Sequence, residues 1–144
     1  MRVISSNARR SENGRPDWFT GPVWLDEIAV GVAPSNLRVH SVTFSPGART
    51  AWHTHPLGQA LHVLSGVGRV QRQGEPVREI RPGYSVWIEP GERYWHGASP
   101  AHVFVHLAVQ EATPDGEEAS WFEHVTEEEY NAPPKAIGGE GMAQ

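Results

Sequence analysis

Two histidines one residue apart, His53 and His55, most restrict how this 144-residue chain can fold. Side chains alternate between the faces of a β-strand, so both imidazoles would point the same way, about 7 Å apart along the strand. Two imidazoles on one face can bind one metal ion, since histidine is the commonest metal ligand. A turn through Pro56 and Gly58 can bring the side-chain oxygen of Gln59 back towards the same point. This stretch therefore predicts a metal site built on paired strands.

The rest of the chain divides into short extended segments separated by turns. Strands are expected at residues 18–25, 37–44, 50–55, 59–64, 69–73, 77–80, 85–88, 93–96, 101–110 and 121–125. The 15 glycines and 12 prolines supply the turns, and strands that recur roughly every 8–12 residues are typical of a sandwich or barrel. Thr126 and Glu129 have the spacing of a capping box, which predicts a short helix ending near Asn131. We therefore expect an all-β fold with a short C-terminal helix.

Length and composition limit the domain number and the partners. A chain of this length suits one domain, which we place at residues 17–132, between a polar arm at residues 1–16 and a flexible tail at residues 133–144. The net charge of −5, without a basic run, argues against nucleic acid or an anionic membrane as a partner. The sequence has no cysteine, and we see no apolar signal segment and no membrane-spanning apolar run, so we expect a cytoplasmic protein.

Polar side chains on two further strands share faces with apolar residues. His40 alternates onto the face of Val42 and Phe44, and His106 lies on one face with Gln110. These faces would meet the two central histidines in the interior of a barrel. A polar face is costly to bury without partners, so the cluster indicates a functional site. Three other histidines lack such a constellation and are expected at the surface: His62, His102 and His124.

Two spaced motifs then carry a resemblance to the cupin family. The first cupin motif is a glycine, five residues, His-x-His, three or four residues, an acid, six residues and a glycine. The chain matches every spacing with Gly47, His53, His55, Gln59 and Gly66, although glutamine stands where glutamate is usual.

The second cupin motif is a glycine, five residues, Pro-x-Gly, two residues and a histidine. Gly83 and Gly91 match it, while Glu89 replaces the proline and Tyr94 stands at the histidine position. More narrowly, residues 50–59 and 90–97 resemble small bacterial cupins associated with carboxymuconolactone decarboxylases, some of which are manganese-dependent hydroxynitrile lyases. Members of that group usually have His-Trp-His where this chain has Tyr94-Trp95-His96.

The resemblance implies a jelly-roll barrel of two antiparallel sheets with a divalent metal inside. We expect manganese, with iron, nickel or zinc as alternatives, a small-molecule substrate, and a homodimer or higher homo-oligomer. The expected metal ligands are His53, His55, Gln59 and Tyr94, and the expected catalytic residues are His106, His96, His40 and Gln110.

The completion of the metal shell stays open at this point. Tyr94 could bind through its phenolate oxygen, although its free pKa is near 10. His96 has the same strand parity, but it lies about 7 Å further along and would need a β-bulge to take the ligand role. Alternatively, Tyr94 stands back as a hydrogen-bond donor and leaves a metal with three protein ligands. The neutral Gln59 would keep the site positive and favour an anion such as cyanide, a carboxylate or an enolate.

Three functions are compatible with these residues. The first is a lyase of hydroxynitrile-lyase type, in which the metal is a Lewis acid and His106 or His40 carries a proton. The second is a metal-dependent oxygenase or oxidative C–C cleaving enzyme. The third is a cupin that binds a small molecule or metal without catalysis, and fold alone cannot separate the three.

Overall fold

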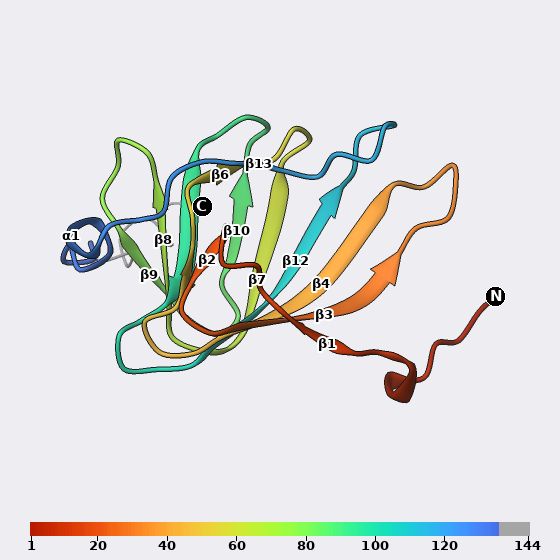
Figure 1. The fold of residues 1–144 in the computed structure, drawn as a ribbon, viewed down its shortest axis with the longest axis horizontal. Helices are drawn as coiled ribbons and strands as arrows, with labels where there is room; N and C mark the ends of the chain where they lie inside the picture. The colour runs from red at the N-terminus through yellow and green to blue at the C-terminus, as the bar shows by residue number, and fades with distance from the viewer. Residues whose placement is uncertain (136–144) are drawn as a thin grey trace.

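The computed structural model describes residues 1–135 as two antiparallel sheets (Figure 1). The first sheet has the strand order β1-β3-β4-β12-β7-β10. Its strands are Ser11–Asn13 (β1), Val23–Val30 (β3), Leu37–Phe44 (β4), Phe104–Glu111 (β12), Gln59–Gly66 (β7) and Ser85–Ile88 (β10). The predicted all-β class, with two antiparallel sheets and one short helix, is confirmed.

The second sheet carries the histidine strand. It runs β13-β6-β11-β5-β2, and β8 pairs with both β11 and β9. Its strands are Ser120–Trp121 (β13), His53–Thr54 (β6), Tyr94–Ala98 (β11), Arg49–Thr50 (β5), Phe19–Thr20 (β2), Gly68–Arg72 (β8) and Arg78–Ile80 (β9). A short 3-10 helix, Ser6–Ala8, precedes the first strand. No helix within residues 1–135 is long and apolar enough to cross a membrane.

Alternation of buried and less buried side chains explains why β4 and β12 form strands at the centre of the first sheet. Along β12, Phe104, His106 and Ala108 are buried, while the residues between them are only half-buried. Opposite them on β4, Val42 and Phe44 are buried on the face that also carries His40. Full burial of a large apolar side chain contributes about 1.5–3 kcal/mol, so this alternation fixes which face of each strand meets the core.

The apolar core joins the two sheets. Phe44 and Phe104 from the first sheet pack in one cluster with Tyr94 and Ala98 of β11, and the two phenylalanine rings lie 5.8 Å apart. The core therefore places the inner face of β11 against the centre of the first sheet.

The structure differs from the expected elements at both ends of the chain. The segment expected at residues 18–25 is split at Gly21-Pro22 into β2 and β3, and β3 continues to Val30. Within the polar N-terminal arm, Ser11–Asn13 pairs with β3 as β1. The last strand ends at Trp121, earlier than expected. β1 is polar and exposed and has no apolar alternation that would predict a strand. Its strand form depends on the ladder with β3.

Gly66 at the end of β7 is required by its surroundings. Its φ is 79°, and a Cβ atom there would lie 1.7 Å from the carbonyl oxygen of Val103. Only glycine adopts such a conformation at low cost and admits so close an approach. The pairing of β7 with β12 shifts register next to this point, between Val105 and His106.

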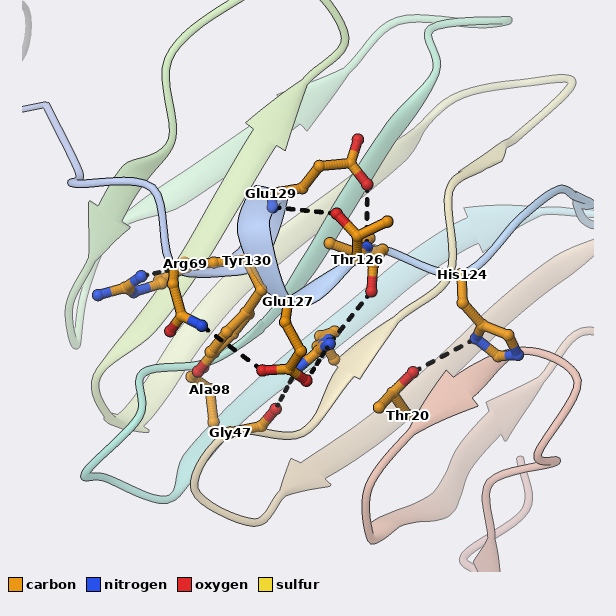
Figure 2. Close-up of polar contacts among 12 residues, drawn as sticks. Thr20, Gly47, Arg69, Ala98, His124, Thr126, Glu127, Glu129 and Tyr130 are labelled. Carbon is orange, nitrogen blue, oxygen red and sulfur yellow. Dashed lines mark hydrogen bonds and ion pairs between the residues drawn. The ribbon is translucent and has the colours of Figure 1, made fainter.

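The short helix α1 (Glu127–Tyr130) lies beside β8 and β9 at the end of the molecule opposite the N-terminus (Figure 1). The predicted capping box is present: Glu129 N donates to Thr126 Oγ1, and Thr126 N donates to Glu129 Oε1 (Figure 2). Tyr130 then anchors the helix, because its hydroxyl donates to the Ala98 carbonyl at 2.5 Å. Of the expected tail at residues 133–144, residues 136–144 lie outside the described part of the chain.

Trp95 and Tyr130 form a second apolar cluster under α1, on the outer face of β11. It also contains Trp52, Val77 and Val125. The side chains of β11 are thus buried on both faces of the strand.

Candidate functional site

A cavity of about 700 Å³ lies between the two sheets. The polar side chains of its wall come from both sheets and from the loop before β13, and they include His40, His53, His55, Gln59, His96, His106, Gln110 and Glu118. Seven of the eight residues expected in the site therefore lie around one cavity. Tyr94, the eighth, is 1% exposed and packs in the core, with its ring 4.4 Å from the His53 ring, centroid to centroid.

His53 lies on strand β6 between two aromatic rings. Its ladder partners are Tyr94 on one side and Trp121 on the other, and both rings lie 4.4 Å from the imidazole, centroid to centroid. The His53 Nδ1 atom lies 2.9 Å from the carbonyl oxygen of Ala51. A carbonyl only accepts, so Nδ1 carries the proton and Nε2 keeps its lone pair.

His55 is also oriented by a hydrogen bond to a backbone carbonyl. Its Nδ1 atom lies 2.7 Å from the carbonyl oxygen of Glu118, so Nδ1 donates. Its Nε2 atom is buried without a hydrogen-bond partner among residues 1–135. The His53 and His55 rings lie 5.1 Å apart. Metal-binding histidines characteristically donate one ring N–H to a carbonyl and leave the other nitrogen for the ion.

Burial keeps four imidazoles of the site neutral at pH 7, those of His53, His55, His96 and His106. It lowers the pKa of His53 to about 3 and that of His106 to about 4. It also lowers the pKa of His55, and it lowers the pKa of His96 well below the usual value, with repulsion from the neighbouring histidines as a further cause. Neutral imidazoles are the form that binds metal ions and accepts protons.

A chain of hydrogen bonds leads from Tyr94 out of the core. The Tyr94 hydroxyl donates to Gln59 Oε1, and Gln59 Nε2 donates to Gln110 Oε1. Gln110 Nε2 then donates to Glu118 Oε1 at 3.0 Å. Burial raises the pKa of Tyr94 well above its usual value, so its oxygen remains a protonated phenol. Tyr94 is thus a hydrogen-bond donor to Gln59, which is one of the roles that the sequence left open for it.

His96 and His106 form a pair on opposite sheets. Their rings meet edge to face at 4.8 Å, and both pack against Phe44. His96 Nδ1 and both ring nitrogens of His106 are buried without a hydrogen-bond partner among residues 1–135. The pairing of β11 with β8 is regular from Tyr94 to Ala98, and the His96 ring lies 5.6 Å from the His53 ring, centroid to centroid.

Of the remaining four histidines, one lies at the cavity and three lie at the surface, as expected. His40 is half-buried on the cavity side of β4. His62 and His102 are exposed and lie beside Ser85 and Ser99, and His124 is exposed beside Thr20 (Figure 2).

Sequence reasoning missed Glu118 and Trp121. Glu118 reaches the site twice, through its backbone carbonyl to His55 and through its carboxylate to Gln110. It lies in the loop before β13, and a backbone carbonyl leaves no trace in a sequence pattern. Trp121 was expected in a strand, but its stacking on His53 depends on the ladder between β13 and β6.

The donors at the cavity wall suit a divalent cation. Among residues 1–135, no group of three or more His, Cys, Asp or Glu side chains is arranged to hold a metal ion. A shell built on His53 and His55 would therefore take its third protein donor from the amide oxygen of Gln59. Two imidazoles and one oxygen leave positions open for a substrate, as in the sites that use two histidines and a carboxylate.

Comparisons with known proteins agree with this fold. The profile of the Cupin domain family matches residues 40–107. The chain is 50% identical over 130 residues to the (R)-mandelonitrile lyase of Granulicella tundricola, a match that covers 90% of this chain and 98% of that protein.

Two solved structures are similar over most of the chain. A cupin-like protein from Thermotoga maritima has a TM-score of 0.77 and 41% identity, over 84% of this chain and 91% of that one. The polyketide cyclase RemF from Streptomyces resistomycificus has a TM-score of 0.69 and 18% identity, over 90% of each chain. The second likeness shows the fold alone.

Proposed function

The chain belongs to the cupin family, and we propose that it is a metal-dependent lyase of hydroxynitrile-lyase type. The observation that carries the proposal is the cavity with four neutral, buried imidazoles, two of which have Nδ1 hydrogen-bonded to backbone carbonyls. The identity to a mandelonitrile lyase over 98% of its length supports this reaction over the other cupin chemistries.

His53, His55 and Gln59 would hold the metal ion, for which manganese is our proposal. A divalent cation would act there as a Lewis acid on the hydroxyl or carbonyl oxygen of the substrate. Because Gln59 is neutral, these three side chains bring no negative charge, which suits a reaction that releases an anion.

His106 and His96 supply the proton chemistry. An unpartnered, neutral ring nitrogen of His106 accepts the hydroxyl proton of a cyanohydrin. The carbonyl double bond forms as the bond to the nitrile carbon breaks, and that bond's electron pair leaves with cyanide. The imidazolium then returns its proton to cyanide, which yields an aldehyde and hydrogen cyanide. His96, 4.8 Å away by ring centroids, is placed to share the proton.

The wall of the cavity suits a small, partly apolar substrate. Val42 and Ala108 line it together with Trp121, and its volume of about 700 Å³ lies within the range of small-molecule sites. An aromatic or aliphatic group of a cyanohydrin can pack against these side chains, while its hydroxyl and nitrile groups meet the histidines.

Cyanide release from mandelonitrile tests the proposal. Manganese-loaded protein should release cyanide, and His106→Ala should lower the rate about 10²–10⁴-fold, because a general base contributes that much. The metal content of this variant should stay unchanged, and His62→Ala, at an exposed position, is the matched control. Oxygen uptake without cyanide release would instead favour an oxygenase. Protein that holds no metal and releases no cyanide would favour a non-catalytic binding protein.

A further inference from the structure

The hydrogen bonds from Tyr94 to Glu118 all run in one direction. In each of the three bonds, the donor is the group nearer to Tyr94 and the acceptor is the group nearer to Glu118. Both glutamines in between can turn their amides, because an amide donates at one end and accepts at the other. A group at either end of the chain can therefore set its direction.

Only Glu118 has a fixed role. A phenol can donate or accept, so Tyr94 would satisfy the chain in either direction. An ionised carboxylate accepts only, so the group that faces it must be the N–H₂ of Gln110. Gln110 then presents its oxygen to Gln59, and Gln59 must turn its nitrogen outwards and its oxygen inwards to Tyr94. An amide oxygen can bind a cation, whereas an amide N–H₂ cannot.

We infer that Glu118 is a positioning residue that sets the direction of both glutamine amides and thereby turns the Gln59 oxygen towards the metal site. This inference rests on the proposed metal site and names the residue that orients one of its ligands. Glu118 also fixes the proton on His55 Nδ1 through its backbone carbonyl. One loop residue thus orients two of the three proposed ligands, one through the main chain and one through the side chain. Arg38 Nε lies 3.8 Å from the second carboxylate oxygen of Glu118 and ties the loop to β4.

Substitutions of Glu118 can remove or reverse the direction of these hydrogen bonds, while its backbone carbonyl stays in place to accept from His55. In Glu118→Gln the end group can donate or accept, so both directions become available. In Glu118→Lys the end group only donates, which reverses the chain and turns the Gln59 N–H₂ inwards. Manganese affinity, measured by calorimetry, should fall from wild type to Glu118→Gln to Glu118→Lys, and the last should lose about 10–100-fold, as is usual for groups that orient metal ligands.

Two further variants distinguish the effect of hydrogen-bond direction from effects of charge or of loop packing. Glu117→Lys makes the same change of charge at the exposed neighbouring residue and should bind manganese within about twofold of wild type. Adding Gln110→Glu to Glu118→Lys places an acceptor-only carboxylate directly against Gln59 Nε2. This should restore most of the affinity, which a role of Glu118 in loop packing alone would not predict.

A nuclear Overhauser measurement on metal-free protein reads the amide direction itself. The Gln59 side-chain N–H₂ should give a weak signal to the Tyr94 ring protons in wild type and a strong signal in Glu118→Lys. An unchanged signal would overturn the inference whether or not the protein binds manganese. Absence of manganese binding in wild type, together with the expected change of signal, would contradict the proposed function alone. A Glu118→Lys affinity equal to that of Glu117→Lys would also overturn the inference.

Discussion

The two faces of β11 are equally buried but differ in whether their polar groups have hydrogen-bond partners. On the outer face, Trp95 is fully buried and its Nε1 donates to Gln71 Oε1 at 2.7 Å. On the inner face, His96 is 4% exposed and its Nδ1 has no partner among residues 1–135, as is also true of both nitrogens of His106 across the cavity. An unsatisfied buried polar group costs about 1–3 kcal/mol. The outer face therefore satisfies its buried polar group, whereas the inner face leaves imidazole nitrogens unpaired at a cost in stability.

The cluster around Tyr130 shows how the outer face is completed. The guanidinium carbon of Arg49 lies 4.5 Å from the centre of the Tyr130 ring, and Arg49 donates to the Val125 carbonyl and to Glu127 Oε1. The hydrogen bond from Arg49 also lowers the pKa of the Glu127 carboxyl. Arg49 Nε is the exception, because it is buried without a partner among residues 1–135. Substitutions on the two faces should accordingly separate stability from metal binding.

Trp95→Ala should have the largest effect on stability. Removing a fully buried tryptophan leaves a cavity and should lower the free energy of unfolding by about 3–5 kcal/mol. Urea denaturation of metal-free protein measures the loss, and calorimetry on the folded variant should show a manganese affinity within about twofold of wild type. A loss below about 1 kcal/mol would show that the outer face does not carry the fold as described.

His53→Ala should have the largest effect on metal binding. The variant loses one of two imidazoles that share the ion, so affinity should fall by more than about 100-fold. In wild type, manganese at 100 times its dissociation constant should stabilise the protein by about 2.7 kcal/mol, and thermal denaturation should show no such increase in the variant. An equal increase in both proteins would contradict the assignment of His53 as a ligand.

Tyr94→His sharpens the comparison on the inner face. It replaces a neutral phenol with an imidazole at the motif position where cupins usually have histidine, so manganese affinity should rise about tenfold or more. Calorimetry on both proteins measures the difference. Unchanged or weaker affinity would indicate that the hydrogen bond from Tyr94 to Gln59 matters more than a fourth nitrogen ligand.

Tyr130→Phe should have the smallest effect. It removes the hydrogen bond to the Ala98 carbonyl but keeps the ring beside Trp95. The free energy of unfolding should fall by about 1 kcal/mol, with manganese affinity unchanged. A change in affinity above about threefold would mean that the outer face communicates with the metal site, contrary to the separation described above.

The sequence predicted those parts of the site that depend on local pattern. The alternation along β12 placed His106 and Gln110 on the cavity side, and the spacing of His53, His55 and Gln59 placed them at one wall. The capping box at Thr126 predicted the helix for the same reason, since its hydrogen bonds join residues three apart. These features follow from short-range geometry, which the order of residues specifies directly.

The features that the sequence did not predict depend on pairing over long distances. β1 is a strand because it lies against β3, and nothing in Ser11–Asn13 itself favours that form. Glu118 acts on His55 through a backbone carbonyl 63 residues away in sequence. The role of Tyr94 stayed open for the same reason, because its partner Gln59 belongs to the opposite sheet.

Titration of manganese into metal-free wild-type protein tests the central claim most directly. Calorimetry should show one saturable site per chain, and the same titration of the His53→Ala variant should show none of comparable affinity. Binding of one ion in wild type that is lost in the variant is the predicted result. Wild-type protein that binds no divalent cation, or binds it equally well without His53, would contradict the assignment of this cavity as a metal centre.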